Sequence, residues 1–268
     1  MEGAVMRHML PCSTLLVSHN NLLTTVDEHC ACFIAEQYMF IHVVNHYFGL
    51  DSNGSTSHFL DLSSYYHDRS SSCAHALFEM IPRIATFARR ATETYPRHLD
   101  PGIIEEFHTI EQEILSWEVP EPVDTRTYAW PAPDKDEITA ALFTQMALII
   151  TLQCALNGPG IPKPYIKRQV DASLCEANLL LKQISSSSMA WAMLLWPLAH
   201  IGSCITSQTE QEDYVSMILG IEDKVRGCAV SISVLVRLWE AAREDERYYG
   251  PFGIQEFMKR EQITPCMG

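Results

Sequence analysis

The sequence predicts an all-α fold: a single multi-helix domain of about nine to ten helices, arranged as antiparallel pairs. Apolar residues recur at helical spacing along most of the 268 residues. Capping residues or prolines stand where that periodicity begins, as they do at helix N-termini. No Asn-Gly turn joins two alternating apolar runs, which would be the clearest hairpin signal. These three observations together favour helices over strands.

The first half of the chain contains four expected helices. Thr25 and Glu28 form a capping box ahead of a helix over 25–48. Residues 51–72 are rich in Ser, Asp and Asn and predict a loop. Pro82 is expected to kink the next apolar run or to divide it into helices over 73–81 and 83–95. Asp100-Pro101 combines an N-cap with proline at the first helical position, and it opens a helix reaching Trp117.

A connector with four prolines covers 118–134 and marks the candidate internal boundary. Beyond it we expect helices near 135–156, 164–185, 188–204, 209–226, 229–247 and 253–261. The charges of residues 134–137 suit a helix N-terminus, and Thr209 with Glu212 forms a second capping box. The expected organisation is an N-terminal helix and polar loop over 1–72, then a helical domain over 73–268 that contains the connector.

Two long runs lack Asp, Glu, Lys and Arg: residues 138–162 and 183–209. The first contains Gln and Thr and breaks at 157–160, and the second begins with four serines and carries Pro197 and His200. A membrane span needs about 20 strongly apolar residues. Buried core helices are therefore the expectation, and no membrane association is predicted.

The charge is strongly negative, at −14. Residues 1–134 hold 7 Lys/Arg and 18 Asp/Glu, and no basic run occurs anywhere in the chain. Such a field repels phosphate backbones, so no direct nucleic-acid binding by this chain is predicted.

No residue pattern predicts catalysis, a metal or a cofactor. His42 and His46 share a helix face, but Val43 stands where a zinc protease has Glu, and Cys30 lies three turns away. The His enrichment before residue 76 lacks a nucleophile. The nine cysteines are scattered, and no signal peptide opens the sequence, which favours buried thiols in a protein that is not secreted.

An aromatic and thioether cluster is the candidate ligand site. Its members are Trp191, Met193, Trp196, His200 and Trp239. Core packing explains such a cluster, and a pocket for a small apolar ligand is the alternative.

From about His75 onward the chain resembles the fungal-specific transcription factor domain, the regulatory region that usually follows a zinc binuclear cluster. The resemblance is carried by LWPLAHIG at 195–202, where the family shows an aliphatic residue, Trp-Pro, apolar residues and Gly. A charged helix, an apolar helix and a closing Trp follow, at 210–226, 230–238 and Trp239. The six clustered cysteines of the family's DNA-binding module do not occur in this sequence.

The resemblance implies a nuclear regulator, with the cytoplasm as the other expected location. Three hypotheses follow. The chain is a transcriptional regulator without its own DNA-binding module, which controls metabolism, secondary metabolism in particular, by binding a protein partner or a small apolar metabolite; a homodimer is a further expectation. Alternatively, it is a biosynthetic cyclase-like or isomerase-like enzyme that reuses the helical scaffold, or an incomplete gene product. The sequence favours the regulator over the enzyme.

Overall fold

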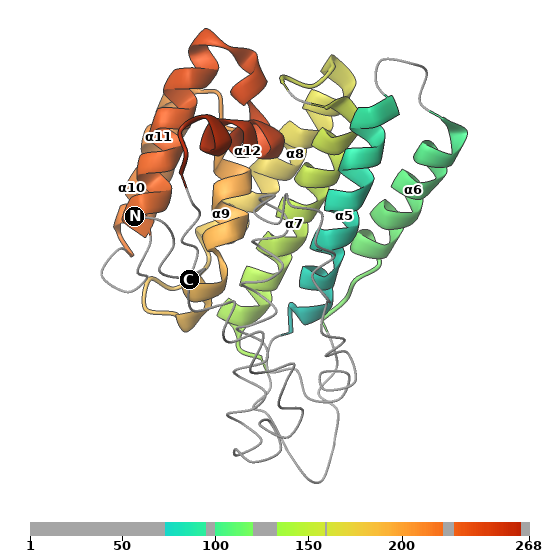
Figure 1. Cartoon of the computed structure of the whole chain (residues 1–268). Coiled ribbons are helices and arrows are strands. Elements are labelled where there is room, and N and C mark those ends of the chain that lie inside the picture. Colours follow the sequence, from blue (N-terminus) through green and yellow to red (C-terminus); the bar gives the residue numbers. More distant parts are fainter. Residues whose placement is uncertain (1–72, 95–99, 120–132, 159, 222–227, 264–268) are drawn as a thin grey trace, which may run out of the picture.

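The structure is a computed structural model that describes residues 73–94, 100–119, 133–158, 160–221 and 228–263 (Figure 1). This part of the chain is all-α and contains no strand, as predicted. The predicted helix over 25–48, the loop over 51–72 and the His42/His46 pair lie outside it. Its elements are α5 (His75–Thr94), α6 (Pro101–Leu115), α7 (Lys135–Asn157), α8 (Pro164–Leu181), η1 (Met189–Met193), α9 (Leu195–Gly202), α10 (Gln208–Leu219), α11 (Cys228–Glu244), η2 (Glu246–Tyr248) and α12 (Gly250–Arg260).

Helix α7 is the central element, and α5, α6, α8, α9 and α12 all pack against it (Figure 1). It begins at a complete capping box, in which Asp134 accepts from the Glu137 N–H and Glu137 accepts from the Asp134 N–H. It is apolar and long enough to cross a membrane, but 83% of its most apolar window is buried inside the protein. The prediction of a buried core helix over this run is confirmed.

The polar residues of α7 are compatible with burial because each of those described next has a hydrogen-bond partner on α7 itself or on α6. Thr139, Thr144 and Thr151 each donate to the carbonyl four residues earlier, at 2.7 to 2.9 Å. Gln145 donates to the Ile114 carbonyl at 2.6 Å, which satisfies the C-terminal end of α6. Buried hydroxyl and amide groups with such partners carry little desolvation penalty.

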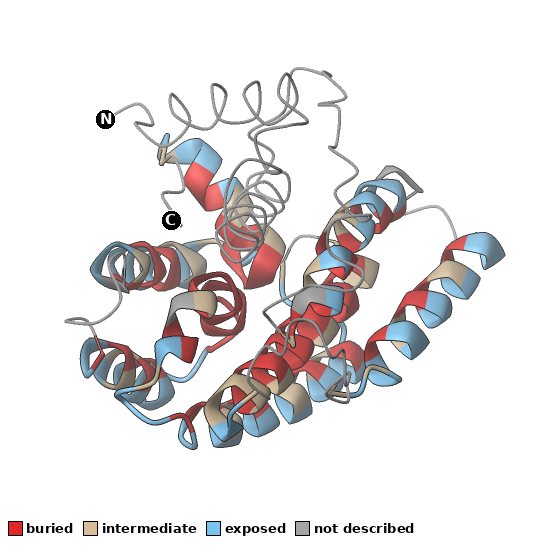
Figure 2. Ribbon diagram, turned by 90° about the horizontal axis from the view of Figure 1, so that it is seen from below, coloured by how far each residue is buried: buried red, intermediate tan, exposed pale blue. Residues whose placement is uncertain are grey.

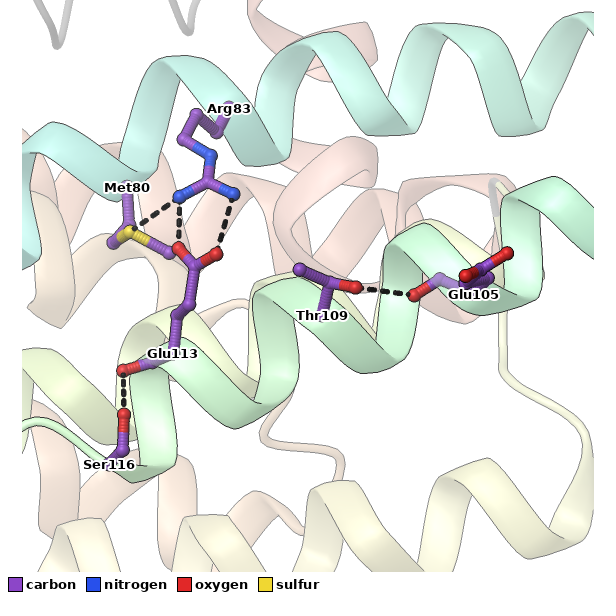
Figure 3. A network of polar contacts seen from close by, with 6 residues as sticks. All are labelled: Met80, Arg83, Glu105, Thr109, Glu113 and Ser116. Atoms are coloured by element: carbon purple, nitrogen blue, oxygen red, sulfur yellow. Dashed lines mark hydrogen bonds and ion pairs between the residues drawn. The ribbon is translucent and has the colours of Figure 1, made fainter.

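Helices α5 and α6 form an antiparallel pair beside α7 (Figure 1). Pro82 lies inside α5, so the expectation of separate helices over 73–81 and 83–95 is wrong. Leu77, Ile81 and Ile84 are buried on both sides of the proline, and this continuous apolar stripe holds the helix together. Figure 3 shows Arg83 of α5 reaching Glu113 of α6, where the guanidinium and carboxylate form a salt bridge.

The C-terminal elements pack around α9. The single helix expected over 188–204 is instead η1 followed by α9, and Pro197 lies in the first turn of α9, where its missing N–H costs no hydrogen bond. The cap of α10 is Ser207, which accepts from the Glu210 N–H, so the capping box expected at Thr209 is wrong. Figure 2 shows buried residues facing inward between the helices and exposed residues on their outer sides.

Candidate functional site

Helix α9 lies at the centre of the predicted ligand cluster, and all eight of its residues are buried. Trp196 and His200 are four residues apart, so they lie on the same face of the helix. Their ring centroids are 4.3 Å apart at an interplanar angle of 39°. The structure therefore brings these two predicted residues into direct contact in the core.

His200 also contacts α7, through the Thr151 hydroxyl at 2.9 Å from Nδ1. The Thr151 hydroxyl has one proton and donates it to the Ala147 carbonyl at 2.7 Å, so its oxygen accepts from the imidazole. Nδ1 is then the protonated nitrogen of a neutral ring. Complete burial lowers the pKa of His200 from 6.5 to about 3, so the imidazole stays neutral at physiological pH.

The end of α9 is fixed by side chains from α10 and α11. Trp239 donates from Nε1 to the Gly202 carbonyl at 2.9 Å, and the Tyr214 hydroxyl donates to the Leu198 carbonyl at 2.8 Å. A Cβ on Gly202 would lie 2.8 Å from a Leu235 methyl and 2.9 Å from the Tyr214 ring. Gly202 thus allows α10 and α11 to approach the helix closely.

The remaining two predicted residues lie on η1. Trp191 is buried, and its Nε1 donates to the Ser185 carbonyl at 2.9 Å, within the same connection between α8 and α9. Met193 is partly buried. The predicted set thus comprises one stacked pair, Trp196 and His200, with Trp239 bonded to the end of their helix and Trp191 anchoring the segment before it. Ligand binding by these residues stays a prediction.

A second polar group beside α9 was not anticipated from the sequence. Cys154 of α7 and Cys204 just after α9 both lie next to Gly250, where a Cβ would be 3.7 and 3.8 Å from their sulfurs. A hydrogen bond with Cys204 raises the pKa of the Cys154 thiol, and burial raises it further. Burial also raises the pKa of the neighbouring Tyr249 phenol. The Cys154 thiol therefore stays protonated and unreactive at neutral pH.

The spacing of these residues in the sequence could have indicated which of them share a helix face. Thr151 and Cys154 are three residues apart on α7, and His200 on α9 is four residues before Cys204 in the turn that follows it. Each pair shares a helix face, so two small polar groups on α7 meet two on the α9 segment. The arrangement joins the two elements in the core, where burial keeps His200 and the Cys154 thiol neutral.

Comparison with known families identifies the chain. The model of the fungal-specific transcription factor domain matches residues 24–264. The chain belongs to this family. The match begins upstream of His75, so membership extends further toward the N-terminus than the residues that first suggested it. Neither the curated proteins nor the solved structures gave a match.

Membership of the fungal-specific transcription factor domain family supports a regulatory role for the chain. The residues that suggested the family now have structural positions in it. Trp196-Pro197 lies in the first turn of the buried helix α9, Gly202 ends that helix, and Trp239 closes the segment by donating to the Gly202 carbonyl. The shared pattern thus corresponds to the packing of α9 against α11.

Proposed function

We propose that this chain is a regulatory domain that controls transcription of metabolic genes, including those of secondary metabolism, through a protein partner. The family match over residues 24–264 carries the proposal. The net charge of −14 adds to it, because an acidic domain acts on DNA most readily through another, basic protein. The same family membership supports a nuclear location.

The core contacts favour a protein partner over a small apolar metabolite. Trp191 and Trp239 donate their indole protons to backbone carbonyls, and Trp196 stacks on His200. A ligand entering between these side chains would have to break contacts that fix α9. The same contacts give the enzymatic alternative no support, since the buried His200 bonds to Thr151 and is neutral.

Two measurements test the proposal. In the first, the gene is deleted and transcripts of neighbouring genes are measured, with the wild-type chain restored as control. In the second, the full chain is fused to an unrelated DNA-binding domain, and transcription of a reporter carrying that domain's binding site is measured. We expect transcripts to change on deletion and the reporter to respond to the fusion. Unchanged transcripts together with an unresponsive reporter would overturn the proposal.

A matched pair of variants links the reporter response to the fold. Trp196→Ala removes a fully buried side chain and should cost about 3–5 kcal/mol of stability. Leu219→Ala changes a side chain that is 47% exposed and should leave the fold intact. We expect the reporter response to be lost with the first variant and kept with the second.

A further inference from the structure

The outer face of α8 carries an apolar stripe. Tyr165, Ala172 and Leu179 follow one another at seven-residue spacing, so they lie on one side of the helix along about 21 Å. Tyr165 is 52% exposed and Leu179 is 59% exposed. Cys175 is exposed beside them. The opposite side of α8 is buried on α7 through Ile166, Val170, Leu174, Ala177 and Leu181.

Basic residues flank this stripe in an otherwise acidic protein. The segment 163–182 holds four Lys/Arg and two Asp/Glu, whereas the whole chain has a net charge of −14. Lys167 is paired with Asp171 on the same helix. Arg168 and Lys182 are exposed on the same flank as Cys175, and they form no ion pair within the described part of the chain. Cations beside an exposed apolar stripe fit an acidic amphipathic helix.

Helix α6 has these complementary properties. It contains four glutamates and no Lys or Arg. Its outer face exposes Ile104 by 41% and Leu115 by 53%, which are eleven residues or about 17 Å apart. Figure 3 shows that Glu113 reaches across to Arg83 of α5, while Glu105 lies further along α6. Glu105 is exposed and one residue from Ile104.

We propose that the exposed face of α8 binds the exposed face of α6 on a second copy of this chain. The apolar stripes have similar lengths, and the charges beside them are opposite. Tyr165 of one copy packs against Ile104 of the other and Leu179 packs against Leu115, so the two helices run parallel and Glu105 pairs with Arg168. The contact is a property of this surface, independent of the proposed role in transcription.

The dependence of self-association on salt concentration tests the charged part of the contact. General repulsion between two copies of charge −14 weakens as salt rises, so a purely apolar contact would strengthen with salt. The same repulsion acts on the proposed contact, but the attraction between Arg168 and Glu105 is screened as well, so the difference in association between the wild type and Arg168→Glu should shrink as salt rises.

The test measures the mass of the purified full chain by sedimentation over a range of concentrations. We expect a mass that rises above the monomer value of 30.3 kDa with concentration. Arg168→Glu should weaken association about tenfold, and Glu105→Arg in the same chain should restore it. Arg89→Glu makes an equal charge change at an exposed site on α5 and should have no effect.

A second pair of variants tests the apolar part of the contact. Leu179→Ser should weaken association, whereas Leu219→Ser, at a similarly exposed position on α10, should not. Circular dichroism of each variant checks that the helices are retained. A chain that stays monomeric at every concentration, an association that ignores Arg168→Glu, or equal effects of the two serine variants would overturn the proposal. The reporter assay has a separate readout, so failure of either proposal is recognised by itself.

Discussion

The buried neutral His200 makes the stability of the fold depend on pH, and His200→Gln should remove that dependence. The imidazole has a pKa of about 3 in the folded chain and an ordinary value of 6.5. Between these values the unfolded chain binds a proton that the folded chain does not. The contribution of His200 to stability is therefore complete above about pH 6.5 and is lost progressively as the pH falls toward about 3.

The size of the effect follows from the pKa difference. Each pH unit below 6.5 costs about 1.4 kcal/mol until the folded pKa is approached. At about pH 5 the wild-type chain should have lost about 2 kcal/mol through this residue. Glutamine has no titrating group, so the variant should lack that part of the loss, whatever its stability at neutral pH.

Denaturant unfolding followed by tryptophan fluorescence measures both chains at several pH values. The other ten histidines cancel when the wild type is compared with the variant. Thr151→Val is the matched control, because it removes the hydroxyl at Nδ1 but leaves His200 buried, and it should keep the wild-type pH slope. Equal pH slopes for the wild type and His200→Gln would refute the reasoning.

Three further substitutions test particular contacts by thermal or denaturant unfolding. Gly253→Ala would place a Cβ 2.2 Å from the Tyr248 carbonyl carbon, so we expect a loss of more than about 4 kcal/mol; a stable variant would contradict this close packing. Trp239→Phe removes the indole donor to the Gly202 carbonyl, but that carbonyl still accepts from the backbone N–H of Ile205. The substitution should therefore cost about 1 kcal/mol, and no loss of stability would mean that the indole hydrogen bond contributes nothing. Asp134→Ala removes the capping box of α7 and should also cost about 1 kcal/mol, and an unchanged midpoint would argue against the cap.

The helices and their order were predictable from the sequence because apolar residues recur at helical spacing. Whether a proline interrupts a helix depended on tertiary packing. Pro82 lacks an N–H, and its local effect predicts a kink or a break. The buried Leu77, Ile81 and Ile84 on either side outweigh that local cost. Pro197, unlike Pro82, lies near a helix start. In the first turn of α9 a proline costs no hydrogen bond, which favours a helix that begins there.

The candidate site was predictable within one helix and not between helices. The four-residue spacing of Trp196 and His200 is enough to place them on one face. The hydrogen bond from His200 to Thr151 joins residues 49 apart in the sequence, and the position of Cys154 beside Cys204 depends on how α7 and α9 pack. The sequence shows which residues share a face of each helix. It does not show how far one helix is shifted along the other, and that shift decides which residues meet.

The burial of α7 has a consequence for how the chain folds as it leaves the ribosome. Helices α5 and α6 are synthesised before α7 and can cover one side of it, but α8 and α9 are synthesised afterwards. During that interval α7, which has no charged residue after Glu137, exposes apolar surface that other unfinished chains can bind, so this is the stage at which aggregation competes with folding. The short connection from Asn157 to Pro164 brings α8 next in order, so the exposed side is covered by the first helix that follows.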